Sequence, residues 1–341
     1  MSTLVSSNPP IPAAGGTGLF PDSYDLTDLG ESADGLPLLP VALNDAGQAA
    51  VYAQPPERHA KHALIRGLLW KDGALTSAGT AFGAIPVAGL SNGGHVCGFT
   101  RTDGGRRSAW ASHLGEFGAR HWPGAESAAV AVNASGHVTG QVAFAAGDRV
   151  RRRVFVAGPY HDAHFLPSPG GGSAVAAAIN DRGEVLLNGS RGYFEINSQA
   201  ALWRDGQCTV IDTPASGGSW GAALSPGGRV AGRLLTSAGN ICAFLHEEGR
   251  TYDINRGPSC QSEALALNDD RVVVGRMMDG TGRREAFRWT PADGMRALRG
   301  LVPAADGWEF HRAVGVNARG QIAGVGLCDG GLRGFLLTPA G

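Results

Sequence analysis

The side chains in this sequence best suited to chemistry are carboxylates and histidines beside short apolar runs. Glu309 and His311 stand two residues apart, and Glu263 precedes the run ALAL. Histidine titrates near neutral pH and burial moves a carboxylate toward that range, so these residue types suit general acid–base catalysis. A structural or solvated role is the alternative for each of them, because no spacing among them requires catalysis. The catalytic candidates are Glu309, His311 and Glu263.

A second group of residues suits ligand binding. Trp220 and Trp308 lie outside the pattern in which the other tryptophans recur, and such rings can stack on a flat ligand. Arginine forks pair with carboxylate, phosphate or a polar planar ring. The alternative is local packing for the tryptophans and solvation for the arginines. The ligand-binding candidates are Trp220, Trp308, Arg107, Arg153, Tyr193 and His59.

The sequence contains none of the common metal or cofactor motifs. The sequence has no GxGxxG that opens a helix, no phosphate-binding loop, no HExxH and no EF-hand loop. His59 and His62 have i, i+3 spacing but no carboxylate beside them, which is a weak metal signal. We therefore predict no cofactor and no metal site.

The elements that position these residues come from a segment that recurs seven times, for example VAVNASGHVTG from Val130. Each copy places an aliphatic residue before an Asn or Ser anchor, and successive anchors are 42 to 49 residues apart. Gly follows three residues later in six copies, and Arg271 replaces it in the seventh. Asn and Gly tolerate left-handed backbone, so each copy predicts a tight turn between two strands. The anchors are Asn44, Ser91, Asn133, Asn180, Ser225, Asn268 and Asn317.

Each copy continues with a third strand such as AALWRDG from Ala200 and a short fourth strand such as TYDI from Thr251. Four-stranded units that repeat every 40 to 50 residues or so are typical of β-propeller blades. The position two residues before each anchor holds only Ala or Gly, which predicts close approach of the innermost strands. The sequence predicts an all-β fold, a seven-bladed β-propeller with four antiparallel strands per blade.

The two ends of the chain predict how the ring closes. After Asn317 the chain supplies a third strand, FLLTPAG, but no fourth, while YDLTDLG from Tyr24 looks like a fourth strand without a blade before it. We expect residues 24–29 to complete the seventh blade and remove an open sheet edge. Residues 1–20 are predicted to be a flexible tail, and 21–341 a single propeller domain.

These repeats resemble the bacterial HAF-repeat family, whose repeat reads A-x-A-[IL]-N-x-x-G-x-[VI]-x-G, then H-A-F-x-W and D-L-G. The resemblance covers about residues 24–341, and the Asn–Gly half is kept. It implies a propeller and no defined chemistry. The histidine of the family name is replaced at all its positions, which hold Arg66, Ser108, Arg153, Gln199, Cys242, Glu285 and Arg333.

Composition excludes several classes of protein. A net charge of −1 argues against a nucleic-acid partner, which needs a basic face. No apolar run approaches the roughly 20 residues of a membrane span. The first residues lack the pattern of a secretory signal, and the five cysteines have no CxxC spacing, so we expect a cytoplasmic protein with reduced thiols.

Two functions fit these observations. The first is a propeller that binds a small molecule, a polar heteroaromatic or anionic metabolite, at the mouth of the central channel. One version of this hypothesis is a cofactor-independent enzyme that acts on this metabolite. The second is a non-catalytic scaffold that binds a protein or peptide, with Arg152 and Arg153 among its contacts. In both, the longer loops opposite the anchor turns are the expected binding face.

Overall fold

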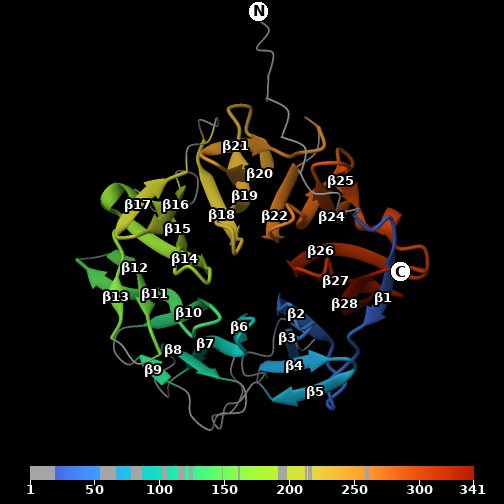
Figure 1. Ribbon diagram of the computed structural model, residues 1–341, viewed down its shortest axis with the longest axis horizontal. Helices are drawn as coiled ribbons and strands as arrows, with labels where there is room; N and C mark the ends of the chain where they lie inside the picture. Colours follow the sequence, from blue (N-terminus) through green and yellow to red (C-terminus); the bar gives the residue numbers. More distant parts are fainter. Residues whose placement is uncertain are drawn as a thin grey trace, which may run out of the picture.

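The computed structural model describes residues 20–53, 67–77, 87–101, 106–113, 120–122, 126–147, 149–159, 162–190, 198–211, 213, 217–257 and 261–341. These residues form seven four-stranded antiparallel sheets, arranged as a ring around a central axis (Figure 1). The predicted all-β, seven-bladed propeller is confirmed. None of the helices in the described part of the chain is long and apolar enough to cross a membrane.

Blades one to six each take four consecutive strands, innermost first. Blade one has β2 (Leu38–Leu43), β3 (Ala49–Ala53), β4 (Gly67–Lys71) and β5 (Ala74–Ser77), and blade two has β6 (Val87–Leu90), β7 (His95–Arg101), β8 (Arg107–His113) and β9 (Arg120–Trp122). Blade three has β10 (Ser127–Val132), β11 (Val138–Ala146), β12 (Arg149–Ala157) and β13 (His164–Phe165), and blade four has β14 (Ser173–Ile179), β15 (Val185–Ser190), β16 (Ser198–Arg204) and β17 (Gln207–Val210). Blade five has β18 (Ser219–Leu224), β19 (Val230–Leu235), β20 (Ile241–Glu247) and β21 (Arg250–Asp253), and blade six has β22 (Gln261–Leu267), β23 (Val273–Met278), β24 (Arg284–Thr290) and β25 (Gly294–Ala297).

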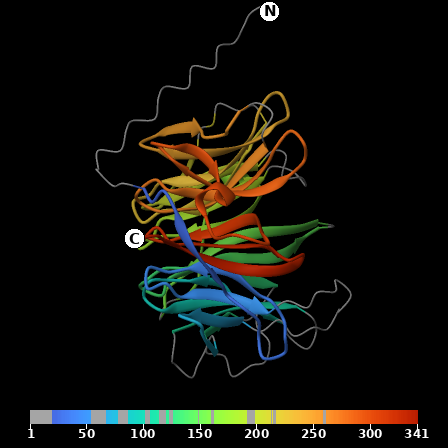
Figure 2. The ribbon, with the colours of Figure 1, turned by 90° about the vertical axis from the view of Figure 1, so that its right-hand side faces the viewer.

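The seventh blade joins the two ends of the chain. Its strands are β26 (Trp308–Val316), β27 (Ile322–Cys328), β28 (Gly331–Pro339) and, outermost, β1 (Tyr24–Asp28). β1 runs antiparallel to β28, with Tyr24 opposite Pro339 and Asp28 opposite Phe335. Figure 2 shows β1 crossing the side of the disc next to this blade. The predicted closure by an N-terminal strand is confirmed, while most of the predicted tail lies outside the described residues.

The cores of blades three, five, six and seven share a pair of residues on the second and third strands. A fully buried Phe on the third strand lies opposite a Gly on the second, and a Cβ on that Gly would approach the Phe ring to 3.0 Å or less. The missing side chain leaves the space that the ring fills, so strand propensity is given up for packing. The pairs are Gly140–Phe155, Gly232–Phe244, Gly275–Phe287 and Gly324–Phe335.

The anchor residues hold neighbouring blades together around the axis. The Asn133 Oδ1 accepts the His137 N–H at 2.8 Å within its own turn, and its Nδ2 donates to the Asn180 carbonyl of the next blade at 3.0 Å. Ser91 and Ser225 accept the bond within the turn, but within the described part of the chain neither side chain bonds the next blade. The bonds between blades run Asn44–Ser91, Asn133–Asn180, Asn180–Ser225, Asn268–Asn317 and Asn317–Asn44.

The small residue before each anchor marks a β-bulge on the innermost strand. All seven innermost strands shift register between the positions four and two residues before the anchor. A Cβ on Gly89 would lie 3.1 Å from the Ala131 Cα, and one on Gly315 would lie 3.0 Å from the Leu43 Cβ. The predicted close approach of the innermost strands is confirmed.

Candidate functional site

One pair of facing positions in each blade differs in residue type from blade to blade, although the repeat makes these positions equivalent. We call the ring of these pairs one level of the propeller. There, the residue five before each anchor on the innermost strand lies opposite the residue eight after the anchor on the second strand. Among the described residues at this level, charged side chains occur only in blades five to seven. The observed pairs are Leu39–Tyr52, Ala128–Gln141, Val175–Asn188, Trp220–Arg233, Glu263–Arg276 and Arg312–Val325.

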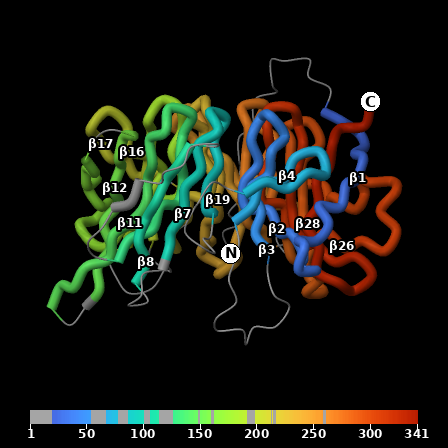
Figure 3. Tube along the Cα trace, turned by 90° about the horizontal axis from the view of Figure 1, so that it is seen from below, coloured from blue at the N-terminus to red at the C-terminus, as the bar shows by residue number. Residues whose placement is uncertain are grey.

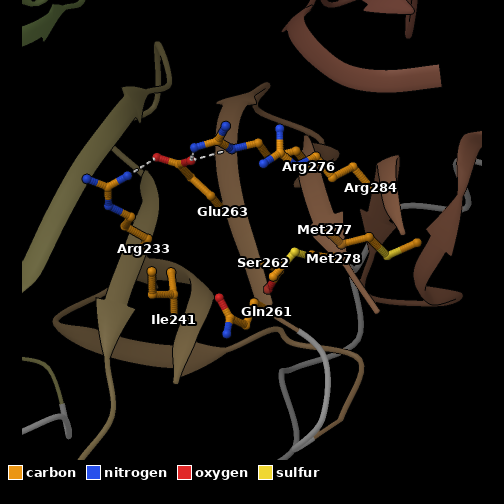
Figure 4. Close-up of a pocket in the computed structure, with 9 residues that line it drawn as sticks. All are labelled: Arg233, Ile241, Gln261, Ser262, Glu263, Arg276, Met277, Met278 and Arg284. Atoms are coloured by element: carbon orange, nitrogen blue, oxygen red, sulfur yellow. Dashed lines mark hydrogen bonds and ion pairs between the residues drawn. The ribbon is translucent and has the colours of Figure 1, made fainter. Parts of the chain in front are cut away.

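Glu263 lies at the centre of this charged group. Its Oε1 accepts a hydrogen bond from Arg233 NH1 at 2.6 Å, and its Oε2 accepts one from Arg276 Nε at 2.7 Å. The Glu263 side chain is 11% exposed, against 27% for Arg233 and 51% for Arg276. Figure 4 shows both arginines turned toward the carboxylate from opposite sides. The carboxylate thus fixes two guanidinium groups, and the trio keeps one net positive charge.

Two further side chains extend the group along the same level. The Arg233 Cζ lies 5.7 Å from the centre of the Trp220 ring, within cation–π range. Arg312 stands in blade seven where Glu263 stands in blade six, so the repeat places it next to Arg276. The Arg312 side chain forms no hydrogen bond or ion pair with any other residue that the structure describes.

Two adjacent cavities open at this group, on the face of the disc opposite the anchor turns. One, of about 200 Å³, is lined by the Glu263 trio, Arg284 and apolar side chains that include Met277 and Ile241. The other, of about 270 Å³, is lined by Trp220, Gly217 and Leu235 among others. Arg233 and Ile241 line both, so the cavities are neighbours. Their walls combine apolar surface with several guanidinium groups, which suits an anionic ligand with an apolar part.

The channel mouth at the anchor turns has a different character. A cavity of about 200 Å³ there is lined by the aliphatic residue that precedes each anchor, from Leu43 to Val316. Its carboxylates accept bonds from neighbouring blades: Asp45 from the Ala318 N–H at 2.8 Å and Asp181 from the Ala134 N–H at 2.7 Å. These groups hold blades together. Among the residues that the structure describes, no three His, Cys, Asp or Glu side chains gather where they could hold a metal ion.

Of the residues predicted to form the site, the structure brings Trp220 and Glu263 together, with Arg233 between them. Arg233 and Arg276 themselves were missed by the sequence analysis. A usable signal existed, because both stand eight residues after an anchor and are therefore cross-strand neighbours of Trp220 and Glu263. Both carboxylate oxygens of Glu263 accept hydrogen bonds from arginines, and its catalytic role stays a prediction.

The two other catalytic candidates form a separate pair at the start of β26. His311 Nε2 lies 3.5 Å from the Glu309 Oε2, and their side chains are 34% and 65% exposed. Trp308 on the same strand is only 9% exposed. Its ring stacks on Phe310 at 5.8 Å and meets Phe335 edge-on at 6.1 Å. This packing favours the local-packing alternative for Trp308 over ligand stacking.

The remaining candidates lie on other blades. Arg107 in blade two covers the Phe99 ring at 4.8 Å and lies 3.8 Å from Glu126. Arg153 belongs to blade three, and Tyr193 and His59 fall outside the described residues. The predicted set is therefore spread around the ring, and a continuous site forms only at blades five to seven within the described part.

Comparisons with known proteins agree with the fold. The β-propeller domain of the Trilobed protease from Pyrococcus furiosus is similar, with a TM-score of 0.60 at 9% identity over 89% of this chain and 96% of that one. The acylaminoacyl peptidase of Pyrococcus horikoshii gives 0.57 at 11% identity over 90% of this chain and 53% of its own. The structure of YCF48 bound to D1 peptide gives 0.50 at 11% identity over 94% and 96%.

At such identities these likenesses establish the β-propeller architecture and nothing finer. No family model matches the chain, and no curated protein matches it. The resemblance to the HAF-repeat family therefore stays a prediction.

Proposed function

We propose that this protein is a binding module that takes a small anionic ligand in the cavities between blades five and six. The observation that carries the proposal is the Glu263 clamp, by which we mean Glu263 and the two arginines bound to its carboxylate. One nine-tenths-buried carboxylate fixes Arg233 and Arg276, so both guanidinium groups are held in place before a ligand arrives. Preorganised guanidinium forks favour carboxylate or phosphate, because two parallel charge-assisted hydrogen bonds form without ordering a flexible side chain.

The apolar part of the ligand would rest on Trp220 and on the aliphatic and thioether walls. Trp220 is partly exposed at the second cavity, and Ile241 and Met277 supply apolar surface beside the arginines. A flat anionic or polar heteroaromatic compound would satisfy both halves of the site. Each cavity is small, which favours a compact metabolite.

Binding without chemical change is the form that we propose. Both oxygens of Glu263 already accept guanidinium hydrogen bonds, which leaves this carboxylate poorly suited to take a proton from a substrate. Glu309 and His311 stand at the exposed start of β26. Catalysis by these residues is the competing proposal, and it predicts a change in ligand mass that simple binding does not.

A peptide with a carboxylate is the second candidate ligand. Two observations favour it: the cavities are neighbours across Arg233, and the propeller of YCF48, similar in fold, was solved with a bound D1 peptide. Such a peptide would place its carboxylate at the Glu263 clamp and an apolar side chain in the Trp220 cavity.

The test is a calorimetric titration with 2-naphthoate and, as the neutral partner of the same shape, 2-naphthamide. We expect naphthoate to bind at least tenfold more tightly, and Arg276→Met to remove most of that preference, since a charge-assisted hydrogen bond contributes about 1.5–3 kcal/mol. Arg250→Met, which removes an exposed arginine from blade five, is the matched control. Equal affinity for the two compounds, or an unchanged affinity in Arg276→Met, would contradict the proposal. Mass spectrometry of the recovered naphthoate separates binding from catalysis.

A further inference from the structure

We propose that the β11–β12 hairpin of blade three docks an extended acidic segment of a partner protein. This hairpin, residues 138–157, is built from two nine-residue strands paired from Val138–Ala157 to Ala146–Arg149. The second and third strands of blades four to six have only six or seven residues. Figure 3 shows the hairpin reaching beyond the body of the disc. Val150 near its outer end is 62% exposed, so this part of the hairpin is accessible in a way that the blade cores are not.

One face of the hairpin combines cations with aromatic rings. Strand register places Phe144 opposite Arg151, and Phe165 of β13 opposite Phe155, so alternation brings Arg151, Arg153, Phe144 and Phe165 to the same face. The Arg153 Cζ lies 5.9 Å from the centre of the Phe144 ring and 5.4 Å from that of Phe165. This stacking leaves the edges of the guanidinium group free to donate hydrogen bonds.

Exposed apolar residues concentrate at this hairpin and at the adjacent strand β13. Val150 is 62% exposed and Phe165 is 51% exposed, and they are the two most exposed of the four exposed large hydrophobic side chains among the described residues. Arg151 and Arg152 are also exposed, and no carboxylate in the described part of the chain pairs with either. Exposed apolar side chains beside unpaired cations are typical of a docking surface.

The outer edge of β12 is open toward the tip. β13 pairs only with Phe155 and Val156 of β12. Closer to the tip, the Leu166 N–H donates to the Val154 carbonyl, and the Arg152 N–H donates to the Ser173 Oγ at 3.3 Å. Beyond these, the outward N–H and C=O of Val150 have no partner among the described residues. A short extended segment can align there, with main-chain bonds at the edge and side chains on the two faces.

Charge selects the kind of partner. Three exposed arginines, Arg151 to Arg153, favour a partner segment with two or more Asp or Glu residues. The exposed Phe165 and Val150 favour an apolar residue between these acidic residues of the segment. A nucleic acid is the less favoured occupant, because binding to a duplex needs a broad basic footprint and this chain has a net charge of −1. The acidic protein segment is therefore the occupant that we infer.

The experiment selects twelve-residue peptides from a displayed random library on the whole protein and measures the enriched peptides by fluorescence anisotropy. Three proteins are compared: wild type, Arg151→Glu/Arg153→Glu, and Arg182→Glu/Arg250→Glu, which reverses two exposed arginines elsewhere. We expect enriched peptides to carry several Asp or Glu residues and an aromatic or aliphatic residue. Their affinity should fall at least tenfold in the hairpin variant and stay within twofold in the control variant.

Phe165→Ala separates docking from simple charge attraction. This exposed side chain should weaken binding about threefold or more, with the thermal unfolding temperature little changed, whereas a purely electrostatic contact would not respond. Library selection that enriches no acidic peptide, or enriched peptides that bind the hairpin variant as tightly as wild type, would overturn the proposal. A fluorescein-labelled 20-base-pair DNA duplex bound more tightly than the peptides would also overturn it, in favour of a nucleic-acid surface.

Discussion

Arg271 shows how one side chain can replace the glycine of a repeat. Its φ of 62° lies in the left-handed region where the other six anchor turns have Gly. A hydrogen bond offsets this backbone strain, because the Arg271 Nε donates to the Glu247 Oε2 at 2.8 Å. The Arg229 Nε donates to the same oxygen at 2.9 Å. Glu247 is 4% exposed, so its carboxylate needs these cations.

Arg271→Gly therefore removes strain but also removes a partner of a buried carboxylate. Relief of the left-handed backbone is worth roughly 1–2 kcal/mol, and a hydrogen bond to a charged group about 1.5–3 kcal/mol. We expect a net loss of about 1 kcal/mol in the free energy of unfolding, measured by urea denaturation. Glu248→Gly is the control, because Glu248 has a φ of 50° in an exposed turn. It should be neutral or stabilising, and a stabilised Arg271→Gly would show that Glu247 does not depend on Arg271.

The carboxyl group of Asp253 should make the free energy of unfolding depend on pH. Burial raises the pKa of its carboxyl above the ordinary value, although the Asn255 N–H donates to it at 2.9 Å. The folded protein then holds this proton more tightly than the unfolded chain. The stabilising contribution is complete below the unfolded pKa of about 3.9 and is lost as pH rises through the folded pKa. Asp253→Asn should lose less stability than wild type between pH 4 and 7 in urea denaturation, and parallel curves would contradict this cause.

At the scale of the elements, the anchor asparagines that bond neighbouring blades allow a graded prediction. Asn133→Ser should keep the bond within the turn, as Ser91 does, and lose only the bond to the Asn180 carbonyl, at a cost of about 1 kcal/mol. Asn133→Ala should lose the bond between blades and also the bonds that Oδ1 accepts from the His137 and Ser135 N–H groups, at a cost of about 2 kcal/mol. Ser91→Ala, which has only the turn bond to lose, is the comparison for a single bond. Equal unfolding temperatures for Asn133→Ser and Asn133→Ala would contradict the separate roles of the two amide ends.

The anchor segments also show what could be predicted from the sequence. Asn, Gly and the small residue recur because every blade has the same turn and the same inner bulge, so the fold and the closing strand follow from repetition. The site does not repeat. Arg233 reaches Glu263 from the neighbouring blade five, and the sequence pattern does not show that contact, whereas Arg276 faces Glu263 across the strands of blade six. The sequence makes Trp308 a candidate for ligand stacking because it lies outside the tryptophan pattern of the repeat. Its local packing with Phe310 and Phe335 explains why it departs from that pattern.

At the scale of the whole molecule, the strap formed by β1 closes the ring. Arg288 strengthens the closure, because its buried side chain donates from NH1 to the Pro21 carbonyl at 2.6 Å. Without β1, the outer edge of the nine-residue strand β28 would be open to other chains. A chain that starts at Gly30 should unfold at a lower temperature and self-associate at high concentration, measured by calorimetry and light scattering. A chain that starts at Phe20 keeps β1 and is the control. Equal behaviour of the two chains would contradict closure by β1.

The cavities at blades five and six remain the central functional claim, and one measurement tests it most directly. Purified wild type and Arg276→Met are incubated separately with a small-molecule extract of the host cell and washed. The retained compounds are then identified by mass spectrometry. We predict that wild type retains an anionic compound of unchanged mass and that Arg276→Met retains much less of it. Retention that is equal in both proteins, or confined to neutral compounds, would contradict the claim, and a compound converted to a new mass would establish an enzyme instead.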